Sequence, residues 1–203
     1  MKKIKAIIFD FGGVILNIDY RKVKKGFENL NILSEKNLFT QKQQSKIFDL
    51  LETGEISEKK FYNLISDKYK KEKIKKIWNS MLLDLPKERL ELLSSLKKNY
   101  KIFLLSNTNS IHIDFLKNRF NKIGWDKFIN LFDQVYLSYK IGMRKPNLEI
   151  FKYLLTKECL VADEVLFIDD SIQHIDAAKK LGINCFLLEK EVDITTVFPD
   201  IIQ

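Results

Sequence analysis

The stretch "IIFDFGGVI", residues 7–15, runs from an apolar segment into a single acidic residue and then into two glycines. The apolar residues Ile7–Phe9 are continuous rather than alternating, which is typical of a strand buried on both faces of a parallel sheet. Asp10 follows this strand directly, and Gly12 and Gly13 offer no side chain beside its carboxylate. We therefore expect Asp10 at the carboxyl end of a core strand, where it is either a turn residue or a functional acid.

Four more apolar runs of the same kind follow along the chain. They are Ile102–Leu105, Gln134–Leu137, Val165–Ile168 and Cys185–Leu188, and with Ala6–Phe9 they make five expected strands. Apolar residues at helical spacing precede the second, fourth and fifth runs, for example Leu90, Leu93 and Leu96. Alternation of strands and helices predicts the α/β class, with a doubly wound, parallel, five-stranded sheet.

The segment between the first two strands breaks this alternation, because it has helix-spaced apolar residues and no strand pattern. The sets are Val23, Phe27 and Leu30; Ile47, Leu50 and Leu51; Phe61, Leu64 and Ile65; and Ile74, Ile77, Trp78 and Met81. We expect residues 17–86 to form an inserted helical cap, and residues 1–16 and 87–203 to form the α/β core. An insertion directly after the first strand would stand over the carboxyl ends of the strands, where open α/β sheets bind their ligands.

The composition of the 203-residue chain, with 45% hydrophobic and 31% charged residues, is ordinary for a soluble globular protein. No apolar run approaches the roughly 20 residues of a membrane span, and no secretion signal is recognisable. The net charge of +8 comes from lysines scattered through amphipathic segments such as "KEKIKKIW", so we expect neither nucleic acid nor a membrane as a partner. We expect Cys159 and Cys185 to be buried free thiols of a cytoplasmic protein.

Six polar residues stand at or just beyond the expected strand ends, or in a loop near them. They are Asp10, Ser106, Asn107, Lys145, Asp169 and Asp170. Because parallel strand ends share one edge of a sheet, we expect these side chains to converge on one cleft. Converging carboxylates without His or Cys favour Mg²⁺, a lysine and a hydroxyl can hold phosphoryl oxygens, and a carboxylate can act as nucleophile. Taken singly, each residue also has an ordinary role as a helix cap, a turn residue or a solvated charge.

The segments "FDFGGV", "LLSNTN", "GMRKP" and "FIDDS" stand in the order and rough spacing of four known motifs. In this the chain resembles the haloacid dehalogenase-like (HAD-like) hydrolase superfamily, which implies a Rossmannoid core with a helical cap between the first two motifs. The resemblance covers about residues 7–188. The wider phrases "YLSYKIGMRKPNLEIF" and "FIDDSIQHIDAAKKLGI" are similar to a bacterial branch that includes a glucose-1-phosphate phosphatase and is related to the phosphatase domain of some epoxide hydrolases.

This resemblance implies a role for each motif residue in phosphoryl transfer. Asp10 would attack phosphorus and form an aspartyl-phosphate, and Lys145 would bridge the phosphate and this nucleophile. Ser106 and the backbone amide of Asn107 would hold the phosphoryl oxygens. Fixed positive charge around the transferring group is the main source of rate enhancement in such reactions.

The resemblance also implies a Mg²⁺ site at the same place. Asp170 and Asp169 would hold the ion together with Asp10 and the backbone carbonyl of Gly12.

The sequence departs from the family pattern at Gly12, where most phosphatases of the superfamily carry a second aspartate that protonates the leaving oxygen. Loss of such a general acid typically costs a factor of about 10² to 10⁴ in rate. Either another donor compensates, for which water, Asp19, Glu52 and Glu55 are candidates, or the substrate has a good leaving group such as an anomeric sugar oxygen.

We therefore expect a Mg²⁺-dependent phosphatase of small phosphorylated metabolites, in particular sugar phosphates such as glucose 1-phosphate, acting as a monomer or weak homodimer. Two alternatives remain. The first is a metal-independent 2-haloacid dehalogenase, against which the paired acids Asp169 and Asp170 argue. The second is a weakly catalytic protein of the same fold that binds a phosphorylated ligand or a partner protein. We expect His112 and His174 to be structural.

Overall fold

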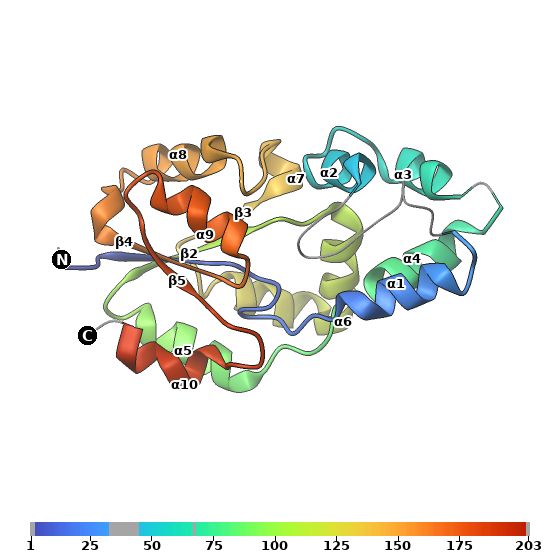
Figure 1. Cartoon of the computed structure of the whole chain (residues 1–203). Helices are drawn as coiled ribbons and strands as arrows, with labels where there is room; N and C mark the ends of the chain where they lie inside the picture. The colour runs from blue at the N-terminus through green and yellow to red at the C-terminus, as the bar shows by residue number, and fades with distance from the viewer. Residues whose placement is uncertain (1–2, 33–44, 67, 202–203) are drawn as a thin grey trace.

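The computed structural model describes residues 3–32, 45–66 and 68–201, and its centre is a five-stranded sheet (Figure 1). The strands are β1 Ala6–Phe9, β2 Lys101–Ser106, β3 Gln134–Leu137, β4 Val165–Asp169 and β5 Asn184–Leu187. Neighbouring strands are parallel, and their order is β3-β2-β1-β4-β5. The predicted α/β class and doubly wound sheet are confirmed, and each strand lies within one residue of its predicted ends.

Helices cover both faces of this sheet (Figure 1). One face carries α5 Lys87–Leu96, α6 Ser110–Ile129 and α10 Ile194–Ile201; the other carries α7 Ser138–Ile141, α8 Leu148–Lys157, a 3₁₀ turn at Ala162–Glu164 and α9 Ile172–Lys179. Along β1, Ile7 and Phe9 belong to the core on the first face, whereas Ala6 and Ile8 belong to the core on the second. Covering of both faces explains why the strands are continuous apolar runs in the sequence.

The long helix α6, which follows β2, is not predicted by the sequence pattern. Its backbone leaves the helical region at Asn121, where φ is 54° and ψ is 171°. The kink changes the direction of the helix, so its apolar residues do not keep one periodic face. The helix begins after Asn109, whose side-chain oxygen accepts a hydrogen bond from the backbone N–H of His112 at 3.1 Å.

Five described helices lie between β1 and β2 in the sequence, and the four that precede α5 gather at one end of the molecule (Figure 1). They are α1 Tyr20–Glu28, α2 Lys46–Glu52, α3 Glu58–Ile65 and α4 Lys71–Asn79. Their apolar faces meet around Trp78, whose ring lies 5.0 Å from that of Phe48 and 5.6 Å from that of Phe61, between centroids. Leu64 is 52% exposed, so its assignment to the buried face of this segment is wrong.

The expected limits of the cap, residues 17–86, stay a prediction. Residues 33–44 and 67 of that range lie outside the described residues.

His112 joins the inserted helices to the core. Its ring stacks on Trp78 at 4.7 Å between centroids, and Nε2 lies 3.2 Å from the backbone oxygen of Trp78. The side-chain nitrogen of Asn109 donates to Nδ1 at 3.3 Å, because the oxygen of that amide already accepts from a backbone N–H. His112 is therefore held as the neutral tautomer with its proton on Nε2, which donates to Trp78. The expected packing role of this histidine is confirmed.

The two cysteines are free, but the expectation that both are buried is wrong, because Cys159 is exposed and Cys185 is half-buried. Cys159 follows the end of α8 with a φ of 53°. Its N–H donates to the carbonyl of Thr156, and the N–H of Leu160 donates to that of Leu155. This is the Schellman arrangement that ends a helix at the surface, usually with glycine at the position that Cys159 occupies.

Among the described helices, none combines the length and the apolar character that crossing a membrane requires.

Acidification should weaken the contact between His112 and Trp78. Burial lowers the pKa of His112 from 6.5 to about 4. The unfolded chain therefore takes up this proton first, so the contribution of neutral His112 is complete above about pH 6.5 and is lost as the pH falls toward 4. We expect the free energy of unfolding to fall by about 3 kcal/mol more in the wild type than in His112→Gln between pH 7 and 4. Urea titrations across this range measure the difference, and parallel curves would contradict the assignment.

Candidate active site

Lys145 lies at the centre of the site, in the loop between α7 and α8, and its side chain is fully buried. Its Nζ atom donates to Asp10 Oδ1 at 2.7 Å and to Asp169 Oδ2 at 2.6 Å. Asp10 directly follows β1 and Asp169 ends β4, and these two strands are neighbours in the sheet. The fold thus brings three of the predicted residues into direct contact.

Both carboxylate oxygens of Asp169 are engaged within the protein. In addition to the contact of Oδ2 with Lys145, Oδ1 accepts from the backbone N–H of Ser171 at 2.8 Å and lies 2.9 Å from His174 Nδ1. His174, for which the sequence suggests only a structural role, therefore contacts the site and also lines its cavity. Asp169 is positioned by two elements, the start of α9 and the loop that carries Lys145.

The cluster contains three carboxyl groups and one ammonium group. Burial raises the pKa of Asp10 above its usual value, although Lys145 opposes the shift. Burial, together with the charges of Asp10 and Asp169, raises the pKa of Asp170 to about 8. Burial acts in the same direction on Asp169, but Lys145 and His174 outweigh it and lower the pKa of that carboxyl. Burial disfavours the charged form of Lys145, but its two carboxylate partners outweigh this effect and raise its pKa.

The three carboxyl groups fit a divalent cation. One oxygen each from Asp10, Asp169 and Asp170 lie within 4.8 Å of one another. Clustered carboxylate oxygens are the donor set that Mg²⁺ and Ca²⁺ prefer. Burial and the two neighbouring carboxyl groups raise the pKa of Asp170, and a cation bound beside it would favour its ionised form.

The two glycines after Asp10 have different reasons to lack a side chain. At Gly13 the φ is +85°, and a Cβ atom would lie 2.1 Å from Asp170 Oδ2, so only glycine lets the turn approach this carboxyl group. At Gly12 a Cβ atom would lie 3.2 Å from Cδ1 of Ile18. A Cβ atom at position 12 would therefore press against the apolar side chain of Ile18.

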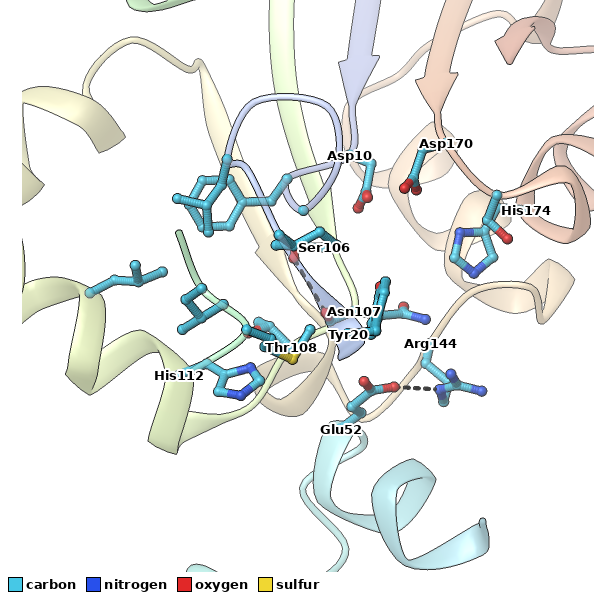
Figure 2. Close-up of a pocket in the computed structure, with 18 residues that line it drawn as sticks. Asp10, Tyr20, Glu52, Ser106, Asn107, Thr108, His112, Arg144, Asp170 and His174 are labelled. Carbon is cyan, nitrogen blue, oxygen red and sulfur yellow. Dashed lines mark hydrogen bonds and ion pairs between the residues drawn. The ribbon is translucent and has the colours of Figure 1, made fainter. Parts of the chain in front are cut away.

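Ser106 and Asn107, at the end of β2, line the cavity as the sequence predicts (Figure 2). The side-chain amide of Asn107 donates to the carbonyl of Lys145 at 2.8 Å and accepts from its N–H at 2.9 Å. Ser138, which the sequence analysis does not identify, clamps the same loop, because its hydroxyl donates to the carbonyl of Thr108 and accepts from its N–H, both at 2.9 Å. The predicted phosphate-binding loop is thus fixed to the loop that carries Lys145 and to the first residue of α7.

The cavity is small, about 90 Å³, and combines polar and apolar walls. In addition to Asp10 and Asp170, its polar lining includes Tyr20, Glu52, Thr108 and Arg144. Of these four, the sequence analysis singles out only Glu52. Arg144 directly precedes Lys145 in the "GMRKP" motif, so its place in the chain was a usable signal. Tyr20 and Thr108 offer no such signal, because only the folded chain brings them to the cavity.

Only one of the three acidic side chains considered as replacement proton donors lines the cavity. Asp19 instead caps α1, accepting from the backbone N–H of Arg21 at 3.0 Å and pairing with its guanidinium. Glu55 is exposed and accepts from the hydroxyl of Thr53 at 2.7 Å. Glu52 does line the cavity, and it is paired with Arg144 (Figure 2).

Residues 7–188 match the family model of haloacid dehalogenase-like hydrolases. The chain belongs to this family. The match spans all four motifs, from β1 to the residue after β5. Membership of the HAD-like family confirms the resemblance that the motifs indicate.

Two kinds of relative extend this comparison. The chain is 33% identical over 196 residues to a D-ribitol-5-phosphate phosphatase of Bacteroides thetaiotaomicron, covering 94% of each chain. Among solved structures, a HAD family enzyme of the same organism, crystallised as an aspartate-to-alanine mutant with magnesium and inorganic phosphate, has a TM-score of 0.85 at 31% identity, with 96% of this chain and 98% of that chain covered. A predicted HAD-like hydrolase of Porphyromonas gingivalis has a TM-score of 0.86 at 26% identity, with 98% of each chain covered.

Alanine substitutions at Gly13 and Gly142 should separate backbone strain from damage to the metal site. Both positions have a φ of +71° or more, but a Cβ atom at Gly142 meets nothing within 4 Å. Each variant should lose at least about 1–2 kcal/mol of stability, because both force alanine into the left-handed region. Only Gly13→Ala should also weaken Mg²⁺ binding, by about tenfold or more, because it displaces Asp170. Calorimetric titration with Mg²⁺ measures this, and equal affinities in the two variants would contradict the account.

Proposed function

We propose that this HAD-like hydrolase is a Mg²⁺-dependent phosphatase that removes the phosphoryl group of small sugar or polyol phosphates through Asp10. The observation that carries the proposal is the buried ammonium of Lys145. It lies 2.7 Å from Asp10 and beside two further carboxyl groups, at the carboxyl ends of β1 and β4. The 33% identical relative named for D-ribitol 5-phosphate supports the substrate class. Glucose 1-phosphate, expected from the sequence, belongs to the same class.

In the first step, Asp10 attacks phosphorus, the bond from phosphorus to the leaving oxygen breaks, and that oxygen takes up a proton. In the second step, water attacks the aspartyl-phosphate, releases inorganic phosphate and restores the carboxylate. Lys145 orients Asp10 and favours its ionised form, because an adjacent cation stabilises the charged form of a carboxyl group. The hydroxyl of Ser106 and the backbone N–H of Asn107 bind the phosphoryl oxygens at the end of β2.

Asp10 and Asp170, with the carbonyl of Gly12, are the residues we propose as Mg²⁺ ligands. Bound Mg²⁺ supplies positive charge that offsets the charge of the phosphoryl oxygens and of the three acids. Asp169 was included in the expected ligand set, but its oxygens already accept from Lys145 and the N–H of Ser171. We therefore assign to Asp169 chiefly the positioning of Lys145. The similar enzyme crystallised with magnesium and phosphate supports the metal.

The leaving oxygen receives its proton from water in this proposal. Ile18 packs beside Gly12, Glu52 is paired with Arg144, and Asp19 and Glu55 make their contacts away from the cavity. Without a side-chain donor, a substrate whose leaving oxygen departs easily is turned over fastest. This favours an anomeric phosphate such as glucose 1-phosphate over a phosphate on a primary alcohol in kcat.

Asp10→Asn should abolish catalysis without unfolding the protein, because it keeps the shape of the side chain and removes the nucleophile. We expect phosphate release to fall by a factor of about 10³ or more. The melting temperature serves as the control for folding. Retention of wild-type turnover in Asp10→Asn would contradict the assignment of the nucleophile.

Removal of Mg²⁺ separates the phosphatase from its two alternatives. With EDTA, phosphate release from sugar phosphates should stop, and added Mg²⁺ should restore it, because the acids of the cluster then repel the phosphate. Halide release from 2-haloacids without metal would support a dehalogenase. Tight binding of a phosphate ester with no release of phosphate in the presence of Mg²⁺ would support a binding protein.

A further inference from the structure

Arg144 and Glu52 form an ion pair in the wall of the cavity, away from Asp10 and Asp170 (Figure 2). The guanidinium Nε donates to Glu52 Oε2 at 2.9 Å, and Nη1 lies 3.0 Å from Asp49 Oδ1. Glu52 is the last residue of α2, whereas Arg144 belongs to the loop of the catalytic lysine. The pair therefore joins the inserted helices to the core at the cavity itself.

The position of Arg144 is fixed relative to the reacting centre. The next residue, Lys145, has its N–H and carbonyl bound by the side chain of Asn107 and its ammonium bound by Asp10. A group bound by Arg144 is thus held at a set distance from a phosphoryl group bound at Asp10. Positioning of this kind is how remote contacts to a substrate contribute to rate.

Stability alone does not account for this pair. The side chain of Glu52 is only 9% exposed and that of Arg144 only 19%, and removal of two charges from water largely offsets their attraction. The inserted helices also contact the core elsewhere, through Trp78 with His112 and through Glu58, whose Oε1 accepts from the hydroxyl of Ser110 at 2.7 Å. A charged pair that lines a substrate cavity is better explained by a ligand that uses it.

We propose that Glu52 and Arg144 bind the hydroxyl groups of the leaving group and make the enzyme select polyhydroxylated phosphate esters. This inference rests on the proposed phosphatase function and goes further by naming the residues that read the substrate. A carboxylate accepts hydrogen bonds from hydroxyl groups, and a guanidinium donates to hydroxyl oxygens, so neighbouring hydroxyls of a polyol satisfy both.

The rest of the cavity wall suits the same substrate. Ile18, Met81 and Leu82 are apolar and line the cavity together with the polar pair. A sugar or polyol has C–H groups as well as hydroxyls, so apolar side chains can pack against its carbon chain while the pair binds its oxygens. An alkyl ester would contact the apolar residues but leave the buried pair unsolvated, which is costly.

Two phosphate esters of equal carbon number test the selection. Ribitol 5-phosphate carries hydroxyl groups on its chain and pentyl phosphate carries none; glucose 1-phosphate is measured beside them. With Mg²⁺, we expect the wild type to hydrolyse one of the two hydroxylated esters with a kcat/KM about 100-fold or more above that for pentyl phosphate. Glu52→Gln and Arg144→Met should each lower this ratio by about 10- to 100-fold.

Asp49→Asn is the matched control, because Asp49 also pairs with Arg144 but does not line the cavity. We expect it to leave the ratio unchanged. An equal fall of the ratio in Asp49→Asn, or an equal loss for both kinds of ester in Glu52→Gln, means that the pair only fastens the inserted helices and overturns the inference. A wild type that hydrolyses hydroxylated and alkyl esters equally also overturns it, while leaving the phosphatase in place. Absence of phosphate release from every ester, phenyl phosphate included, refutes the proposed function itself.

Discussion

The buried ammonium group of Lys145 is the constraint on which the rest of the structure depends. A cation with no exposure to water is stable here only because Asp10 and Asp169 lie 2.7 and 2.6 Å from it. Removal of one partner from such a buried cluster typically costs about 3–5 kcal/mol, because the remaining charge is left unpaired. The two acids reach the lysine only if β1 and β4 are neighbours in the sheet, so the order of the strands and the chemistry of the site require each other.

The cavity is built by two parts of the chain with different tasks. Strand ends supply Asp10, Ser106 and Asp170, and the loop between α7 and α8 supplies Lys145; together these residues suit one charged group of fixed geometry. The helices inserted between β1 and β2 supply Glu52, which meets Arg144 at the cavity wall. Changes in the inserted helices can therefore alter which molecule is bound and leave the reacting centre as it is.

The sequence predicts the sheet and the acids well because both follow from local patterns. Continuous apolar runs mark strands covered on both faces, and residues at their carboxyl ends must share one edge. The features that the sequence does not predict are contacts between residues far apart in the chain and places where a local pattern is interrupted. The kink at Asn121 interrupts the apolar periodicity of α6, so the sequence pattern does not reveal this helix. The positive φ of Cys159 ends α8 at the surface. Ser138 and Tyr20 reach the site only because the chain folds them there.

The paired hydrogen bonds between the side chain of Asn107 and the backbone of Lys145 have a mechanical effect. The amide takes the part that a neighbouring strand would play in a ladder, one donor and one acceptor to the same residue. It ties together two loops 38 positions apart in the chain. Because of these two bonds, we expect the loop after β2 and the loop that carries Lys145 to move together. The distance between the proposed phosphate-binding residues and the ammonium group of Lys145 should then change little when other loops move.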